Sequence, residues 1–230
     1  MPPTSALVTQ VEDEARQAFR GDCSGHDWEH TRRVREMALR IADDEGADTF
    51  IVELAALLHD VADFKRTGSE SAAGDQARAF LVALGVEPDQ AAQVADIISA
   101  VSFKGSAEPD ADTTKEGRCV RDADRLDALG AIGIARAFAY GATVGRNMHD
   151  PSYVPHAQQT RESYRANVPT TIGHFYEKLL LLQARMSTAT GRRVAERRTA
   201  FMRDFLHHFS AEWVGQDADG APHESKDVDP

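Results

Sequence analysis

Cysteine is scarce in this chain: Cys23 and Cys119 are the only two among 230 residues, and no CxxC pair occurs. A dense disulfide framework and a structural zinc site built from thiolates are therefore excluded. We expect two free thiols in a cytoplasmic protein, and the alternative is one disulfide between them.

Long apolar runs and an excess of positive charge are also missing. No stretch approaches the roughly 18 consecutive apolar residues of a membrane span. The opening residues 1–5 lack the basic-then-apolar order of a secretory signal. The formal net charge is −11, with 26 Lys and Arg against 37 Asp and Glu. Since such a surface repels a nucleic-acid backbone, we expect no nucleic-acid and no membrane partner, whereas a small anionic substrate at a locally basic site is allowed.

The alternation of a half-buried β-strand is almost absent, whereas apolar residues recur at helical spacing throughout. We therefore predict an all-α fold, a single-domain bundle of about seven helices over residues 1–214. Within it, 141–168 reads as an irregular, lid-like segment, because it holds several turn formers and no clear period. A disordered acidic tail is expected over 215–230.

Two helix predictions bear on the later argument. The small side chains of Cys119–Tyr140 indicate one continuous helix suited to close packing, and they permit a homodimer. The last helix is expected over about Arg192–Trp213. Its predicted buried face carries four aromatic side chains, Phe201, Phe205, Phe209 and Trp213.

His26 and His30 lie four residues apart at the head of a long amphipathic helix. Val34, Met37 and Ile41 continue the face of His30 at the 4-3-4 spacing of one helical stripe. His30 should therefore face the interior, where an imidazole requires a buried hydrogen-bond partner or a metal ion.

Two further stretches supply partners for His30. One helix delivers His59-Asp60 near its C-terminal end, and another presents Asp124 on a face with Val120 and Ala128. An ionised carboxylate buried there without a partner is costly, and a divalent cation removes that cost while keeping the imidazoles neutral. The set of two imidazoles and two carboxylates suits Mn²⁺, Mg²⁺, Fe²⁺, Co²⁺ or Ni²⁺, with positions left for water and substrate oxygens.

The order His30, His59-Asp60, Asp124 resembles the H…HD…D signature of the HD-domain metal-dependent phosphohydrolases. The flanking segments are similar to the small bacterial YpgQ/YedJ-type branch of that family, from about Glu12 to Trp213; they are Gly25–His30, Asp122–Arg136 and His174–Leu180. The resemblance implies an all-helical fold, these four residues as metal ligands, and one divalent ion, with Mn²⁺ or Mg²⁺ placed first. It also implies hydrolysis of nucleoside triphosphates to monophosphate and pyrophosphate.

Two residues are candidates for proton transfer. Asp63 lies three residues after Asp60 on the same helix face, and related HD hydrolases often carry an acidic residue there. Its carboxylate could exchange a proton with the attacking water or the leaving group, and the alternative is a surface acid at the helix end. His26 shares a face with His30, where it could support the site or contact phosphate.

Phosphate groups need cationic donors, and Lys65 and Lys104 are the expected ones. Arg125 could also contact the substrate or instead pair with Asp122 on its own helix. Asp27 is another substrate-binding candidate, and its alternative role is in a capping box opened by Ser24.

Other functions on the same scaffold stay open. They are a phosphodiesterase, a nucleotidase, a (p)ppGpp-type hydrolase, a di-iron oxygenase with further histidine ligands, and a helical module that senses a nucleotide without turnover. His174 is expected to be a packed or hydrogen-bonded histidine. His149-Asp150 repeats the HD dipeptide in the irregular segment, as chance or as part of a lid.

Overall fold

The computed structural model describes residues 4–19, 27–61, 70–101, 109–155 and 170–216. These residues form nine α-helices and one 3₁₀ helix and no strand, with one isolated bridge between Asn147 and Thr170. The all-α prediction is confirmed. The helices are α1 (Thr4–Ala18), α2 (Trp28–Glu45), α3 (Thr49–Leu58), α5 (Glu70–Ala83), α6 (Pro88–Val101), α7 (Lys115–Asp127), α8 (Gly130–Thr143), α10 (Thr171–Glu177), the 3₁₀ helix η1 (Leu179–Arg185) and α11 (Ala189–Trp213).

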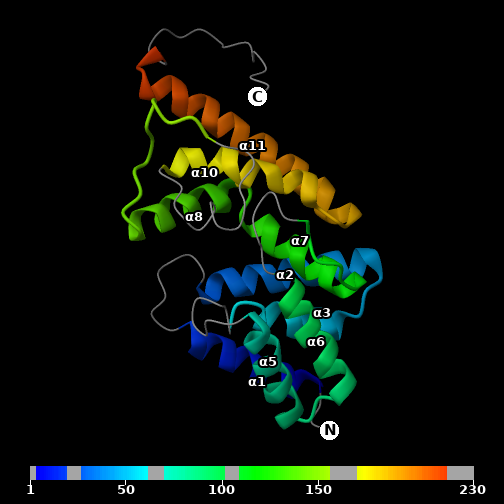
Figure 1. Cartoon of the computed structure of the whole chain (residues 1–230). Helices are drawn as coiled ribbons and strands as arrows, with labels where there is room; N and C mark the ends of the chain where they lie inside the picture. The colour runs from blue at the N-terminus through cyan, green and yellow to red at the C-terminus, as the bar shows by residue number, and fades with distance from the viewer. Residues whose placement is uncertain (1–3, 20–26, 62–69, 102–108, 156–169, 217–230) are drawn as a thin grey trace.

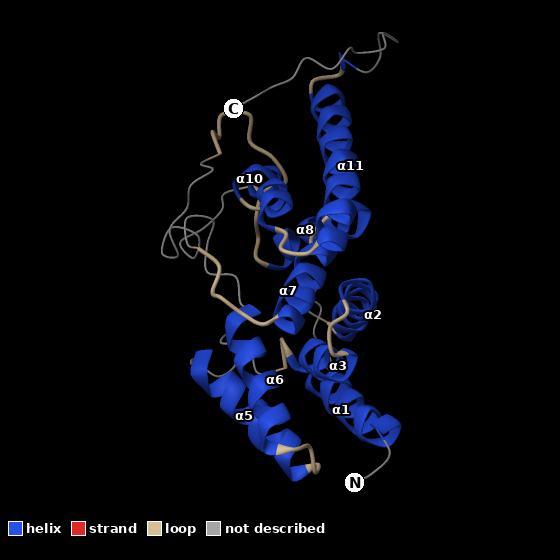
Figure 2. Ribbon diagram, turned by 90° about the vertical axis from the view of Figure 1, so that its right-hand side faces the viewer, coloured by secondary structure: helices blue, strands red, loops and turns tan. Residues whose placement is uncertain are grey.

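Helix α7 joins two groups of helices (Figure 1). Helices α1, α2, α3, α5 and α6 lie on one side of it, and α8, α10 and α11 lie on the other, as the turned view in Figure 2 also shows. The contacts agree, since α7 packs against α2, α3, α6, α8 and α11. A side chain on α7 can therefore meet residues from both groups.

The core near the site is built from α2, α3 and α7. Helix α3 is surrounded by other helices, so seven of its ten residues are buried, from Ile51 to Leu58 with Glu53 as the gap. Helix α2 buries one stripe that includes Val34 and Ile41, as its spacing predicted. The cap of α3 is Asp48, whose side chain accepts hydrogen bonds from the first-turn amides of the helix.

The predicted continuous helix over Cys119–Tyr140 is wrong. Helix α7 ends at Asp127 and α8 begins at Gly130, whose φ is 73°. This left-handed conformation favours glycine and turns the chain between the two helices. A Cβ on Gly130 would lie 3.1 Å from Cγ of Arg198, so α11 packs directly on the turn.

The predicted buried face of the last helix is partly wrong. Phe201 and Trp213 are 51% and 45% exposed. The buried stripe of α11 is instead Ala195, Thr199, Met202 and Leu206, at the same 4-3-4 spacing but rotated around the helix. Phe205 and Phe209 are half-buried and pack against the core.

Three further predictions concern the cysteines, membrane-spanning helices, and the lid-like segment and acidic tail. Cys119 is buried and free, whereas Cys23 lies outside the described residues. None of the described helices combines the length and the apolar character that crossing a membrane requires. Of the lid-like segment 141–168, residues 156–169 lie outside the described ranges, as does 217–230 of the acidic tail.

Candidate metal centre

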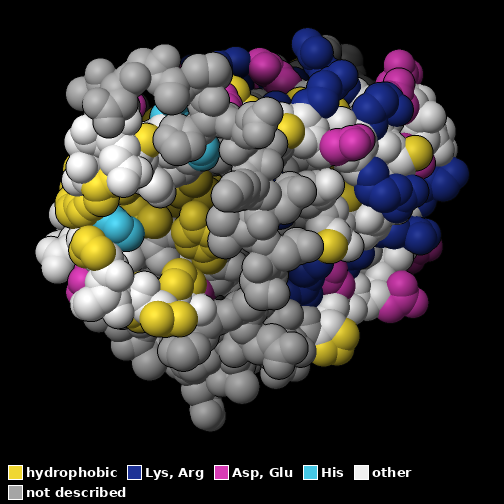
Figure 3. Space-filling view, turned by 90° about the horizontal axis from the view of Figure 1, so that it is seen from above, with side chains coloured by type: hydrophobic (Ala, Val, Ile, Leu, Met, Phe, Trp, Pro, Cys, Tyr) yellow, Lys and Arg dark blue, Asp and Glu magenta, His cyan; other side chains and the backbone are white. Residues whose placement is uncertain are grey.

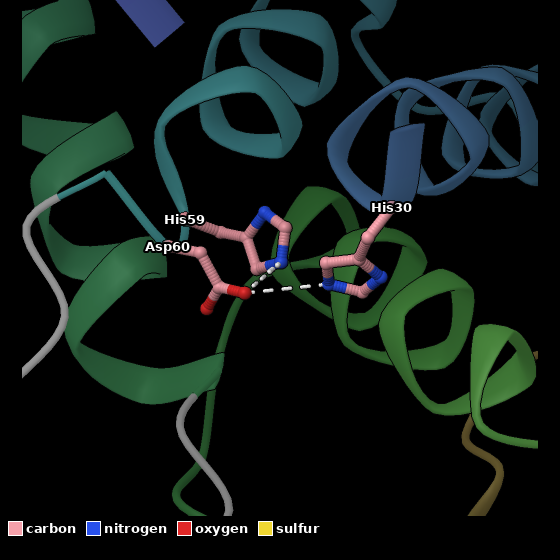
Figure 4. Close-up of side chains that lie close together, drawn as sticks. All are labelled: His30, His59 and Asp60. Carbon is pink, nitrogen blue, oxygen red and sulfur yellow. Dashed lines mark ion pairs between the residues drawn. The ribbon is translucent and has the colours of Figure 1, made fainter. Parts of the chain in front are cut away.

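Three side chains converge where α2, α3 and α7 meet. His30 comes from the first turn of α2, and His59 and Asp60 follow directly after α3. Their ligand atoms all lie within 4.8 Å of one another. Figure 4 shows Asp60 directed at both imidazoles, with Oδ2 3.3 Å from Nε2 of His30 and 3.5 Å from Nε2 of His59.

Asp124 approaches the same point from the last turn of α7. Its Oδ1 atom lies 3.5 Å from Nε2 of His30 and 3.8 Å from Nε2 of His59. The imidazoles are buried, but the side chains of Asp60 and Asp124 are 20% and 31% exposed. Asp124 is not part of the group of three that lies within 4.8 Å, but its Oδ1 atom approaches both imidazoles, and the carboxylate side of the site is open to solvent.

The far nitrogen of each imidazole is engaged by the protein. Nδ1 of His59 lies 2.8 Å from the carbonyl oxygen of Ala56. Because a carbonyl only accepts, Nδ1 donates and Nε2 keeps its lone pair. Nδ1 of His30 lies 2.7 Å from Oδ2 of Asp127 and is likewise placed to donate.

The proton positions on these imidazoles bear on whether the site can bind a metal ion. Within the described residues, the buried Nε2 of His59 makes no hydrogen bond. It instead faces carboxylate oxygens of Asp60 and Asp124. A nitrogen lone pair facing carboxylates is repulsive unless a positive charge lies between them, and a divalent cation supplies it. The donor set therefore fits a divalent metal.

The electrostatics around His30 point the same way. Burial lowers the pKa of His30, but hydrogen bonds to Asp127 and Asp60 outweigh it and raise the pKa to about 9. For Asp127, burial opposes ionisation, but the hydrogen bonds from His30 and Arg33 hold its pKa well below the usual range. The carboxylates thus favour a positive charge at Nε2 of His30, and a divalent cation could take the place of the proton there.

Asp127 is the residue that the sequence analysis missed. It is 4% exposed and contacts His30, Arg33 and Arg136. The available signal was its spacing: it follows Asp124 by three residues, hence on the same helical face one turn later. Nothing in the spacing shows that its partners are on α2 and α8.

Asp27 is the N-cap of α2, where its side chain accepts a hydrogen bond of 2.9 Å from the amide of His30. The predicted capping box with Ser24 placed Asp27 three residues inside the helix, and that position is wrong because α2 begins at Trp28. By capping the helix, Asp27 fixes the backbone at His30, a candidate ligand. Its contact with a substrate stays a prediction.

Arg125 is buried and binds Asp110 through Nη1 and Nη2, and its Nη1 also donates to the carbonyl oxygen of Arg185 at 2.7 Å. The predicted pairing with Asp122 is wrong. The carboxylate of Asp122 instead accepts hydrogen bonds from the amides of Ser187 and Thr188. Contact of Arg125 with a substrate stays a prediction.

Four other predicted residues lie outside the described ranges, and they are His26, Asp63, Lys65 and Lys104.

His174 has a buried Nδ1 with no hydrogen-bond partner in the part of the chain that the structure describes. Burial, followed by the charges of Lys178 and Arg146, lowers its pKa to about 3. His149 packs edge-on against Trp213 at 4.9 Å between ring centroids.

The charge run on α11 is largely solvated. Seen from above, Lys and Arg side chains gather on one side of the molecule (Figure 3). Arg192, Arg193 and Arg197 are exposed, as expected of such a face. Arg198 differs, because it is half-buried and donates to the carbonyl oxygen of Leu126 at the end of α7.

The segment that holds the candidate ligands matches a known protein family. A model of the HD domain matches residues 27–129. The Bacillus subtilis protein YpgQ is 36% identical over 214 residues, which are 91% of this chain and 95% of YpgQ.

Solved structures give the same picture. A Lactobacillus plantarum protein has a TM-score of 0.82 at 41% identity, covering 94% of this chain and 100% of that one. An HD-superfamily hydrolase from Bacillus thuringiensis has a TM-score of 0.73 at 39% identity, covering 92% and 98%. Bacillus subtilis YpgQ in complex with ADP has a TM-score of 0.70 at 33% identity, covering 91% and 96%.

Proposed function

This chain belongs to the HD-domain family, and on that premise we propose that it is a metal-dependent phosphohydrolase that converts nucleoside triphosphates to monophosphate and pyrophosphate. The single observation that carries the proposal is the convergence of four side chains on one point, His30, His59, Asp60 and Asp124. The nucleotide in the proposal is supported by the similar protein YpgQ, which has been crystallised in complex with ADP.

The two proposed histidine ligands are more buried than the two proposed carboxylate ligands, and this difference suggests different roles. The imidazoles of His30 and His59 are buried and held by partners at Nδ1, so they would hold a metal ion in a fixed position. The more exposed Asp60 and Asp124 border the solvent side, where water and phosphate oxygens enter. A bound divalent ion, Mn²⁺ or Mg²⁺ in the first place, supplies a Lewis acid that activates water and polarises a phosphoryl oxygen.

The remaining roles are proposals for six residues that are not among the proposed metal ligands. Asp63 exchanges a proton with the water or the leaving group, and His26 supports that transfer or contacts phosphate. Lys65 and Lys104 neutralise phosphate charge, and Asp27 and Arg125 are further substrate contacts. The acidic balance of the chain supports a small nucleotide rather than a nucleic acid as the substrate.

A nucleotidase, a phosphodiesterase or a (p)ppGpp-type hydrolase would use the same four ligands and differ in the rest of the pocket. A nucleotide-sensing module would keep the ligands without turnover. A di-iron oxygenase is disfavoured, because the metal-binding group among the described residues contains two histidines and no third.

A product screen separates these functions. Metal-stripped protein is supplied with Mn²⁺, Mg²⁺, Co²⁺ or Ni²⁺ and offered nucleoside mono-, di- and triphosphates and a generic phosphodiester, with products resolved by ion-exchange chromatography. Pyrophosphate from triphosphates supports the proposal. Orthophosphate from monophosphates moves the assignment to a nucleotidase, and bound metal with no product from any substrate moves it to a sensor.

A further inference from the structure

The carboxylate of Asp127 is held by three side chains from two other helices. Oδ2 lies 2.7 Å from Nδ1 of His30. Arg33, one turn after His30 on α2, donates from Nε to Oδ1 at 2.7 Å and from Nη2 to Oδ2 at 3.0 Å. Arg136 of α8 donates from Nη1 to Oδ2 at 2.9 Å.

This arrangement leaves Asp127 little freedom. A forked guanidinium on one carboxylate fixes its plane, and a second cation opposes rotation. The two arginines also compensate the cost of burying a negative charge, which would otherwise favour the protonated acid. Asp127 is therefore an ionised, immobile acceptor facing Nδ1 of His30.

An acceptor at Nδ1 determines what Nε2 does. Because Nδ1 keeps its proton, Nε2 is the nitrogen left to bind a metal ion, and it is directed at Asp60 and Asp124. Metal-bound histidines are commonly oriented by a carboxylate in this way, which makes the imidazole a stronger ligand. His59 has only the backbone oxygen of Ala56 in the same place, so the two ligands differ in the charge behind them.

We infer that Asp127 is the positioning residue of the metal centre, fixing the tautomer and the orientation of His30, and that Arg33 and Arg136 hold Asp127 in place for this task. The inference rests on the proposed metal site and adds to it three residues that do not touch the ion.

The turn between α7 and α8 allows Arg136 of α8 to contact Asp127 of α7. Asp127 and Arg136 are nine residues apart. On one continuous helix they would lie on opposite faces and about 13 Å apart along the axis. The turn at Gly130 instead brings α8 back, so that Arg136 meets Asp127 directly. The break in the helix thus has a functional consequence for His30.

The test measures metal affinity directly, by calorimetric titration of metal-stripped protein with Mn²⁺ and Co²⁺. Asp127→Asn keeps the shape of the side chain and removes its charge, and it should weaken binding by about 10–100-fold. The visible absorption spectrum of the Co²⁺ protein should also change, because it reports ligand geometry, which a loss of stability alone would not alter. The matched control is Asp122→Asn, a buried carboxylate of the same helix that binds Ser187 and Thr188.

The control should keep metal affinity within about twofold of the wild type, since its contacts are separate from His30. Folded Asp127→Asn with wild-type affinity and an unchanged Co²⁺ spectrum would overturn the inference. If Asp127→Asn does not fold, Arg136→Gln decides the question. It should weaken binding in the same direction and by less, and unchanged affinity in that variant overturns the inference.

The outcome is separable from that of the proposed function. A wild-type protein that binds metal but hydrolyses no nucleotide contradicts the proposed function, while a weakened Asp127→Asn would still support the inference. A wild-type protein that hydrolyses triphosphates, paired with an Asp127→Asn variant of full metal affinity, contradicts only the inference.

Discussion

Nε2 of His59 lies 3.5 Å from Oδ2 of Asp60, its own neighbour in the chain. Consecutive residues inside a helix diverge by about 100° and do not face one another. His59 is the C-cap of α3 and keeps right-handed helical dihedrals, and in the turn that follows the amide of Val61 donates to the carbonyl oxygen of Leu58. The adjacent His-Asp pair therefore presents an imidazole and a carboxylate to the same point from the C-terminal end of α3.

Removing one carboxylate should disable the site without unfolding the protein. Asp124→Ala should abolish both metal binding and hydrolysis, because two imidazoles and one carboxylate leave the ion under-coordinated. Calorimetric titration with Mn²⁺ and circular dichroism of the same preparation check the two parts. Asp89→Ala, at an exposed position of α6, is the control. Full metal occupancy in Asp124→Ala would show that the assignment of this ligand is wrong.

The pair of Arg125 and Asp110 should contribute to the stability of the fold. Asp110→Ala leaves the buried guanidinium of Arg125 without its main partner. The loss should be about 2–3 kcal/mol, below that of a fully buried pair, because Asp110 is itself 25% exposed. Denaturant unfolding measures it. The nearby exposed Asp112→Ala should stay within about 0.5 kcal/mol of the wild type, and equal losses in the two variants would refute this role.

A side chain at Gly130 should be strained by the backbone and crowded by Arg198. Gly130→Ala places an L-residue at φ 73° and pushes its Cβ against Arg198. Gly46→Ala is the matched control, since Gly46 has φ 65° and nothing within 4 Å of the added Cβ. Gly46→Ala should therefore cost only the left-handed penalty of about 1–2 kcal/mol. Gly130→Ala should cost more and weaken metal binding as well, whereas equal costs and unchanged metal affinity would contradict this account.

His174 should make the protein sensitive to acid. Its pKa is 6.5 in the unfolded chain and about 3 in the fold. Between those values the unfolded state binds more protons, so the free energy of unfolding falls as the pH drops below about 6.5. The loss from this residue between pH 7 and pH 5 is up to about 2 kcal/mol.

Denaturant unfolding at the two pH values checks this expectation. His174→Gln should lose less stability than the wild type on going from pH 7 to pH 5, because glutamine does not titrate. His207→Gln, at an exposed position of α11, should keep the wild-type pH dependence. The same pH dependence in His174→Gln as in the wild type would show that this histidine is already protonated or accessible in the fold.

The sequence predicts the helical class from local spacing, and it predicts the four candidate ligands from spacing together with the resemblance to the HD-domain family. His30 continues the buried stripe of α2, and the HD pair and Asp124 are each visible within one helix. The role of Asp127 could not be predicted in this way. Its partners Arg33 and Arg136 belong to other helices, and the second comes within reach only through the turn at Gly130.

The sequence likewise could not predict which face of α11 is buried. The aromatic repeat of α11 has a helical period, but so does the stripe of Ala195, Thr199, Met202 and Leu206. Periodicity shows that a helix has faces, whereas the neighbours decide which face is covered. Here α7, α8 and η1 pack against α11, and they cover the face with the smaller residues.

The most direct test of a metal-dependent hydrolase at this site compares metal occupancy with turnover in one experiment. Metal-stripped protein is titrated with Mn²⁺, and bound ion and pyrophosphate released from a nucleoside triphosphate are measured at each step, in the wild type and in Asp124→Ala. We expect pyrophosphate release that rises in proportion to the first bound ion and is absent in Asp124→Ala. Release that is independent of added metal, or that persists in Asp124→Ala, would contradict the account.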